Sequence, residues 1–190
     1  MTEVIEINSK LSTFDLYTEF QKIQQSGSLQ PWVEPNATNI CINTTESADP
    51  SDVRLGGMSL DFDWDRAEEV DGKIVLPKRE VPLLEKDFTV LCTQFRGTLF
   101  ETVYNELKNE YNIGRVRIMT SKPKTCLSWH YDSSHRIHYP MKTQKGCFML
   151  FESQHYHLIE NKWYYTYTDK YHTALNSSFE TRTHLVASVI

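Results

Sequence analysis

His130, Asp132 and His172 are the residues of this sequence whose types and spacing are best suited to holding a metal ion. His130 and Asp132 are two positions apart, and side chains at that spacing on an extended strand point to the same face. One short segment can therefore offer an imidazole and a carboxylate to one ion, and a later strand can bring in His172. Two histidines and one carboxylate that leave other coordination positions open are typical of non-haem Fe(II) oxygenases.

Arg182 could provide the positive charge that such a site needs for a co-substrate. Two neutral imidazoles and one carboxylate leave one positive charge on Fe(II), so a dianionic 2-oxoacid needs about one further cation nearby. A guanidinium binds a carboxylate through two parallel hydrogen bonds. Arg182 follows His172 in sequence and is the only arginine in the last fifty residues. We therefore expect Arg182 to bind the carboxylate of the co-substrate.

Four other histidines fit no ligand spacing, and we interpret them as ordinary structural or surface residues. One of them is two positions from Arg182 and can share its strand face. These histidines are His135, His155, His157 and His184.

Composition and charge narrow the class of protein. A net charge of -5 argues against general nucleic-acid binding, which depends on Lys and Arg neutralising phosphates. From Gly114 onward, however, Lys and Arg outnumber Asp and Glu, which suits an anionic small molecule. We find no apolar run of membrane-spanning length and no export signal at the start of the sequence.

The cysteines are widely spaced, at Cys41, Cys92, Cys126 and Cys147. Without an export signal, we expect reduced thiols that are buried as small apolar groups, in a cytoplasmic protein. The sequence leaves the oligomeric state open.

The length favours one domain over residues 1–190, in which residues 1–113 form a helical and irregular N-terminal portion. Ser12 can cap a helix that runs to about Gln25, where Gly27 is a plausible stop. Thr98 with Glu101 resembles a capping box for a second helix. Residues 26–65 are rich in turn-forming residues, with one weak strand at 39–43, and could form a substrate-covering lid or a surface loop without a chemical role. A further weak strand is predicted at 73–76.

Residues 114–190 predict a mainly β catalytic core, because the hydrophobic period there changes from helical to strand-like. Eight short strands separated by turn residues indicate a jelly roll, a cupin-like double-stranded β-helix, against which the N-terminal helices pack. The candidate strands are 115–120, 127–131, 136–141, 147–152, 155–159, 163–168, 173–176 and 183–190.

Five motifs in the same part of the chain occur in the order found in a known family. They are WHYD at 129–132, RIHYPM at 136–141, KGC at 145–147, HTALN at 172–176 and TRTHLV at 181–186. This pattern resembles the aspartyl/asparaginyl β-hydroxylase family of Fe(II)- and 2-oxoglutarate-dependent oxygenases. The resemblance covers roughly the last 40% of the chain, and the first hundred residues match no pattern that we recognise.

The resemblance implies a role for each matching residue. His130, Asp132 and His172 would be the iron ligands, and Arg182 would hold the distal carboxylate of 2-oxoglutarate. Arg136 and His138 would line the co-substrate near its metal-bound end, whereas without the family we would interpret both as a polar strand face. The implied cofactors are Fe(II), 2-oxoglutarate and O2.

The sequence departs from the family pattern at a few positions. Met141 stands where leucine is usual, and residues 143–145 differ from the usual Thr-Asn-Pro stretch. Asn161 occupies a turn where the family generally has glycine, and asparagine tolerates the left-handed conformation. Asp132 is retained, although some animal members lack this carboxylate.

These features predict hydroxylation of an aspartyl/asparaginyl-like or other amino-acid side chain, with release of succinate and CO2. The substrate could be an amino acid, a peptide or another small molecule, and one alternative is a free amino acid such as proline. A cupin-like metal-binding protein without turnover and a zinc hydrolase are alternatives of other classes. The hydrolase would leave Arg182 without an obvious task. We expect no nucleic acid and no membrane among the partners.

Overall fold

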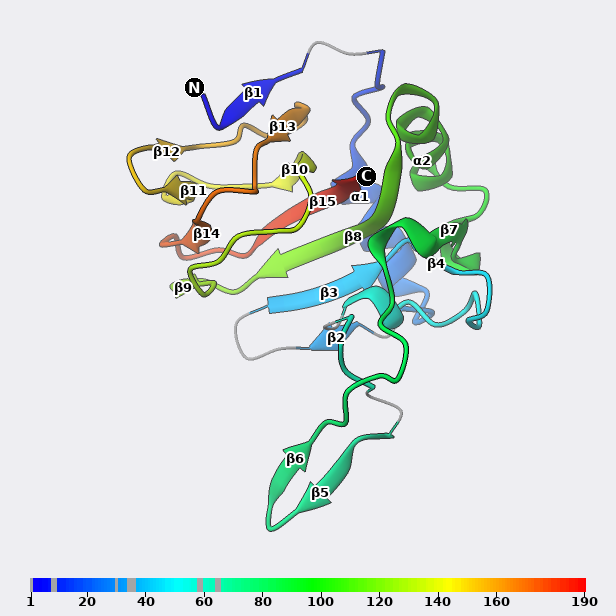
Figure 1. Ribbon diagram of the computed structural model, residues 1–190. Coiled ribbons are helices and arrows are strands. Elements are labelled where there is room, and N and C mark those ends of the chain that lie inside the picture. Colours follow the sequence, from blue (N-terminus) through cyan, green and yellow to red (C-terminus); the bar gives the residue numbers. More distant parts are fainter. Residues whose placement is uncertain (1, 8–9, 30, 34–36, 58–59, 64–65) are drawn as a thin grey trace.

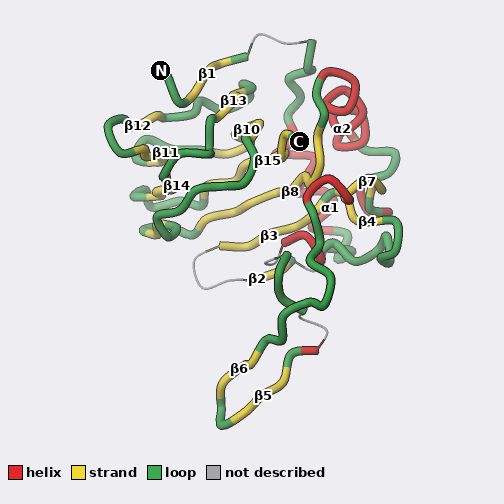
Figure 2. Tube along the Cα trace, in the orientation of Figure 1, coloured by secondary structure: helices red, strands yellow, loops and turns green. Residues whose placement is uncertain are grey.

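Antiparallel strands dominate the computed structural model, which describes residues 2–7, 10–29, 31–33, 37–57, 60–63 and 66–190 (Figure 2). The mainly β class predicted from the sequence is confirmed. None of the helices in these residues has the length and apolar character that crossing a membrane would need.

The largest sheet has seven strands in the spatial order β1, β13, β10, β15, β8, β3 and β2 (Figure 1). In that order the strands span Val4–Glu6, Tyr164–Thr166, Arg136–Lys142, Arg182–Val189, Ile113–Ser121, Ala37–Cys41 and Trp32–Val33. A second sheet has four strands in the order β12, β11, β14 and β9. These span His155–Tyr156, Cys147–Phe151, His172–Asn176 and Thr125–Cys126.

Two small sheets complete the β structure. β4 (Asn43–Thr45) pairs with β7 (Phe88–Leu91), and β5 (Glu68–Val70) pairs with β6 (Lys73–Val75). The β5–β6 hairpin projects away from the rest of the molecule (Figure 1). The short 3-10 helices η1 (Leu55–Gly57), η3 (Glu85–Asp87) and η4 (Thr93–Phe95) lie in the connections.

Both predicted helices are present, but the first begins later than expected. α1 spans Leu16–Gln25 and is capped by Asp15, whose carboxylate accepts a hydrogen bond from the Thr18 amide at 3.0 Å. The prediction that Ser12 is the cap is wrong, because its hydroxyl donates at 2.6 Å to Glu106 on α2 instead. The predicted stop at Gly27 agrees with the end of α1, and Gly27 has a φ of 73°.

α2 (Leu99–Glu110) begins as predicted at Thr98, whose hydroxyl accepts from the Phe100 amide at 3.2 Å. Glu101 completes the cap differently from a capping box, because its carboxylate accepts from the Gly97 amide at 2.6 Å. The predicted left-handed turn residue Asn161 has a φ of 58°.

Seven of the eight strands predicted in residues 114–190 are present, with shorter bounds in several cases. The strand predicted at 127–131 is wrong, because there only His130 makes a bridge, to His172. The carbonyl of Ser128 accepts a hydrogen bond from the His130 ring at 2.7 Å.

Segment 26–65 is more regular than its composition suggests. β3 lies within it and pairs with β8 in the large sheet, and β4 follows directly. Residues 30, 34–36, 58–59 and 64–65 of this segment lie outside the described residues. The single-domain organisation and the lid stay predictions.

All four cysteines are free thiols, as expected. Burial was predicted for each of them and holds for Cys41, Cys92 and Cys147, but Cys126 is exposed. It lies on β9, at the edge of the four-stranded sheet, where no further strand covers it.

One face of the seven-stranded sheet forms the main hydrophobic core with the two helices. Phe20 of α1 and Phe100 and Leu107 of α2 are buried in the same cluster as Ile118 of β8 and Leu185 of β15. Burying each such side chain stabilises the fold by about 1.5–3 kcal/mol. Because side chains alternate along a strand, the other face of this sheet is left for polar residues.

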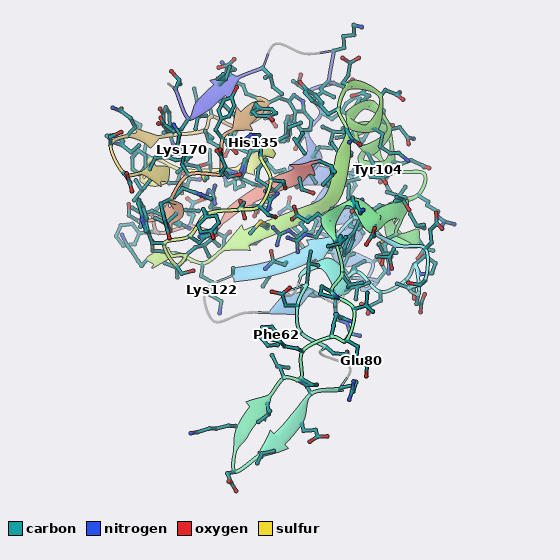
Figure 3. All side chains as sticks on the ribbon, in the orientation of Figure 1. Phe62, Glu80, Tyr104, Lys122, His135 and Lys170 are labelled. Atoms are coloured by element: carbon teal, nitrogen blue, oxygen red, sulfur yellow. The ribbon has the colours of Figure 1, made fainter. Side chains whose placement is uncertain are left out.

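Asn43 joins three strands through its buried side chain. Its Nδ2 donates to the carbonyl oxygens of Phe88 at 2.6 Å and Gly114 at 2.9 Å, and its Oδ1 accepts from the Val116 amide at 2.8 Å. Tyr104 of α2, labelled in Figure 3, donates beside it to the carbonyl of Thr89 at 3.0 Å. The amide therefore replaces ladder hydrogen bonds where the small β4–β7 sheet meets β8.

Asn43→Ala should lower the free energy of unfolding by about 2–4 kcal/mol, because buried backbone groups lose their partners. Denaturant unfolding followed by circular dichroism measures this. Asn105→Ala, at an exposed position of α2, is the control and should change stability by less than about 0.5 kcal/mol. Equal effects of the two substitutions would contradict the role given to Asn43.

Candidate functional site

The sheet face opposite the helices forms the floor of a pocket that the second sheet closes. β10 shows the alternation clearly: Arg136 and His138 line the pocket, while Ile137 and Tyr139 enter the core. β14 of the second sheet contributes His172 and Ala174 from the other side. The pocket brings together all six residues predicted from the sequence, His130, Asp132, Arg136, His138, His172 and Arg182.

His130, Asp132 and His172 form a cluster that could hold a metal ion, with one potential ligand atom from each residue lying within 4.8 Å of the others. Nε2 of His172 is 3.7 Å from Oδ2 of Asp132, and the two imidazole centroids are 4.5 Å apart. The backbone sets this arrangement. The amide and carbonyl groups of His130 and His172 bond to each other at 3.0 and 2.7 Å, and the Asp132 amide donates to the carbonyl of Thr168 at 2.8 Å.

The hydrogen bonds of the two imidazoles leave the same ring nitrogen free in both. Nδ1 of His130 lies 2.7 Å from the carbonyl oxygen of Ser128, and Nδ1 of His172 lies 2.9 Å from that of Lys170. A carbonyl oxygen can only accept, so Nδ1 carries the proton in each ring and Nε2 keeps its lone pair. Histidines that bind metals usually have this second hydrogen bond, which fixes the tautomer and orients the ring. The donor set therefore fits a divalent metal.

Arg136 orients the carboxylate of the cluster. Its Nη2 lies 3.0 Å from Oδ1 of Asp132, which leaves Oδ2 on the side of His172. Its Nη1 donates to Glu85 at 2.9 Å and also to the hydroxyl of Ser134. The guanidinium thus already has partners, and the role that the family resemblance implies for Arg136 beside the co-substrate stays a prediction.

Glu85 is a site residue that the sequence analysis missed. One carboxylate oxygen accepts from Arg115 at 2.7 Å, and the other accepts from Arg136 at 2.9 Å and from Ser134 at 2.6 Å. Burial alone would raise the pKa of Glu85, but the two guanidiniums outweigh it and hold the pKa below its usual range, so the group is ionised. Glu85 thereby fixes Arg136, which in turn fixes Asp132.

A close approach of the backbone places Glu85 in this position. A Cβ at Gly114 would lie 2.3 Å from the carbonyl oxygen of Glu85, so only glycine lets η3 lie this near to β8. Glu85 stands in an irregular connection among other acidic residues, and no sequence motif marks it. The role of Glu85 depends on the close approach of its backbone to Gly114, which joins the N-terminal portion of the chain to the core.

Arg182 and His184 form the far end of the pocket. Nη2 of Arg182 donates to Nδ1 of His184 at 3.1 Å, and burial lowers the pKa of Arg182 to about 10, so the guanidinium remains charged at neutral pH. Within the described part of the chain, no carboxylate pairs with Arg182. A buried cation without a partner is costly, so this end of the pocket suits an anionic ligand. The interpretation of His184 as an ordinary residue overlooked this contact, although the two-residue spacing pointed to it.

His138 supplies further unused polar atoms. Both of its ring nitrogens, and Nε2 of His184, are buried without a hydrogen-bond partner in the residues that the structure describes. Such atoms cost about 1–3 kcal/mol each, which a polar ligand can recover. Burial, together with the charge of Arg182, holds the pKa of both histidines well below the usual range, so both rings are neutral.

The remaining histidines lie elsewhere. The ring of His135 packs against Tyr165 and Tyr167, while His155 and His157 pack against Phe148.

Asn176, from the HTALN motif, shapes the turn after β14. Its Nδ2 donates to the carbonyl oxygens of Ser121, Lys122 and Glu180, and its Oδ1 accepts from the Ser178 amide. These contacts are structural and do not involve the metal cluster.

A sequence profile described as aspartyl/asparaginyl beta-hydroxylase matches residues 81–190, which is more than half of the chain. The chain belongs to the aspartyl/asparaginyl β-hydroxylase family. This confirms the resemblance and places the protein among the Fe(II)- and 2-oxoglutarate-dependent oxygenases. The match begins ahead of Glu85 and so includes η3 as well as the five motifs. Among curated proteins, no sequence matches the chain.

Two solved structures resemble nearly the whole chain of this β-hydroxylase family member. An oxidoreductase of the 2OG-Fe(II) oxygenase family from Burkholderia pseudomallei has a TM-score of 0.51 and 10% identity, with 98% of this chain and 83% of that chain covered. IDO from Bacillus thuringiensis has a TM-score of 0.50 and 12% identity, with 98% and 90% covered. At these identities the likeness concerns the fold, and it confirms the jelly-roll architecture.

Glu85→Gln should weaken divalent metal binding by about tenfold or more, because Arg136 loses the charge that holds it against Asp132. Titration with Mn(II), followed by the electron paramagnetic resonance of the free ion, measures this without turnover. Glu80→Gln, five residues earlier and exposed, is the control. Equal Mn(II) affinity in the two variants would show that Glu85 does not position the ligand.

Proposed function

We propose that this protein hydroxylates a C–H bond of an aspartyl/asparaginyl-like or other amino-acid side chain, using Fe(II), O2 and 2-oxoglutarate. The observation that carries the proposal is the pair of free Nε2 atoms beside Asp132, each fixed by a hydrogen bond on the far side of its ring. Three ligands leave coordination positions for a chelating co-substrate and for oxygen, which is the arrangement of non-haem Fe(II) oxygenases.

In this proposal His130, Asp132 and His172 hold Fe(II), and Arg182 binds the distal carboxylate of 2-oxoglutarate. Bound iron would supply the oxygen activation that couples oxidation of 2-oxoglutarate to succinate and CO2 with insertion of one oxygen atom into the substrate C–H bond. The protein positions both molecules. His138 and His184 offer ring nitrogens to the co-substrate, and Arg136 keeps Oδ2 of Asp132 directed toward His172.

The lack of a carboxylate partner for Arg182 supports this assignment, because a co-substrate dianion would compensate its charge. A free amino acid such as proline, or a small metabolite, remains the alternative substrate. The cytoplasmic location also stays a prediction, and four free thiols support it.

The first test needs no substrate. Under anaerobic conditions, Fe(II) and 2-oxoglutarate together should give the weak visible absorption band of their chelate with the protein. His172→Ala should abolish the band, because it removes one of three ligands, while the fold stays intact by circular dichroism. Metal binding without the band in the unmodified protein would favour a metal-binding protein or a hydrolase instead.

Arg182→Gln should raise the 2-oxoglutarate concentration needed for half of that band by about tenfold or more, because a charged hydrogen bond contributes about 1.5–3 kcal/mol. Mn(II) affinity should change by less than about threefold. Arg96→Gln, an exposed arginine away from the pocket, is the control. If Mn(II) affinity falls and the 2-oxoglutarate requirement does not, Arg182 has another role.

A further inference from the structure

Arg117 is a second guanidinium in the pocket that the proposed chemistry does not use. It lies on β8, opposite Val186 of β15, and its side chain lines the pocket together with the three metal-ligand candidates. Met119, two positions along the same strand, lines the pocket as well. Arg117 is half-buried and therefore partly removed from water.

The side chain of Arg117 differs from the neighbouring arginines, because no residue that the structure describes is its partner. Arg115 and Arg136 both bond to Glu85, and Arg182 bonds to His184. Among the described residues, the side chain of Arg117 makes no hydrogen bond or ion pair, while its backbone belongs to the sheet between β15 and β3. Burial, followed by the charge of the nearby Arg115, lowers its pKa to about 9, so it still carries its proton at neutral pH. Its charge is therefore uncompensated in the ligand-free protein.

Metal and co-substrate do not remove this excess of positive charge. Fe(II), Asp132, a dianionic co-substrate and Arg182 are together neutral. Of the three remaining arginines, Arg115 and Arg136 pair with Glu85, and Arg136 also pairs with Asp132, which is already counted. No further carboxylate among the described residues pairs with any of the three. A surplus of positive charge thus remains on the Arg117 side of the pocket, where only the substrate is left to bind.

Arg117 and Arg182 enter the pocket from different places on the sheet face. Arg117 lies opposite Val186, which is four residues from Arg182 along β15, so the two backbone positions are roughly 14 Å apart on the sheet face. In the proposed function the co-substrate is held by Arg182 and the metal cluster, so Arg117 is available to a second anion in the same pocket.

We propose that Arg117 binds a carboxylate of the substrate and makes this enzyme select an acidic substrate over its neutral amide. The inference rests on the proposed function, since it assumes that Arg182 holds 2-oxoglutarate. The carboxylate could be the side chain of an aspartyl residue in a polypeptide or the α-carboxylate of a free amino acid. Both present the same planar anion to the guanidinium.

Calorimetric titration of the protein loaded with Mn(II) and 2-oxoglutarate tests the proposal with two pairs of probes. The first pair is acetyl-Gly-Asp-Gly-amide and acetyl-Gly-Asn-Gly-amide, and the second is L-proline and L-prolinamide. The acid of one pair should bind about tenfold or more tightly than its amide, and the pair that shows this preference identifies the source of the carboxylate. Equal affinity within both pairs, or no binding of either acid up to millimolar concentrations, would overturn the proposal.

Arg117→Gln should remove the preference for the acid, Arg117→Lys should restore part of it, and Arg96→Gln should leave it unchanged. The 2-oxoglutarate affinity of Arg117→Gln should stay within about twofold of the unmodified protein. A large loss there would instead make Arg117 the co-substrate anchor and refute the inference. If 2-oxoglutarate fails to bind even the unmodified protein, the proposed function itself fails, and the two failures are thus distinguishable.

Thermal unfolding gives a readout that is independent of any ligand. An uncompensated charge destabilises the fold, so Arg117→Gln should have a Tm equal to or above that of the unmodified protein. A clearly lower Tm would mean that Arg117 has a structural partner, which contradicts the inference.

Discussion

The pocket is shaped by one constraint: its arginine side chains carry positive charge and are largely buried away from water. Three arginines line the pocket, and a fourth, Arg115, pairs with Glu85 beside it. The opposite face of the same sheet is the main hydrophobic core, so these side chains have no solvent to turn toward on that face. Glu85 and Asp132 compensate part of this charge. The positive charge that they do not compensate lowers the stability of the fold. Such uncompensated charge is typical of a site that binds anions.

The contacts of Glu85 join parts of the chain that are far apart in sequence. Glu85 belongs to a short 3-10 helix in the N-terminal portion, while Arg136 and Asp132 belong to the jelly roll. Gly114 permits the close approach between them, since any side chain there would collide with the Glu85 backbone. The N-terminal portion therefore does more than cover the core: it supplies the charge that keeps Arg136 against Asp132.

Backbone carbonyl groups fix the tautomers of His130 and His172 and so decide which ring nitrogen is free to bind a metal. His130 and His172 each bond to the carbonyl two residues before them, and the two residues also form a bridge with each other. No regular strand forms at 127–131, and His130 is held by its bridge to His172 and by its ring contact.

The sequence by itself determined the β character of residues 114–190 and most of the strands. It could do so because these features follow from side-chain alternation, which is local. It also predicted that His130 and Asp132 lie together, but no strand forms there, and their backbone bonds to His172 and Thr168 place them instead. It also identified His172 and Arg182, although only through order and family pattern. Contacts decided the rest. Ser12 donates to Glu106 instead of capping α1, and Glu85 is the partner of two arginines. The side chain of Arg117 has no partner in the part of the chain that the structure describes. Which charges meet depends on how distant segments approach each other, and spacing along the chain does not contain that information.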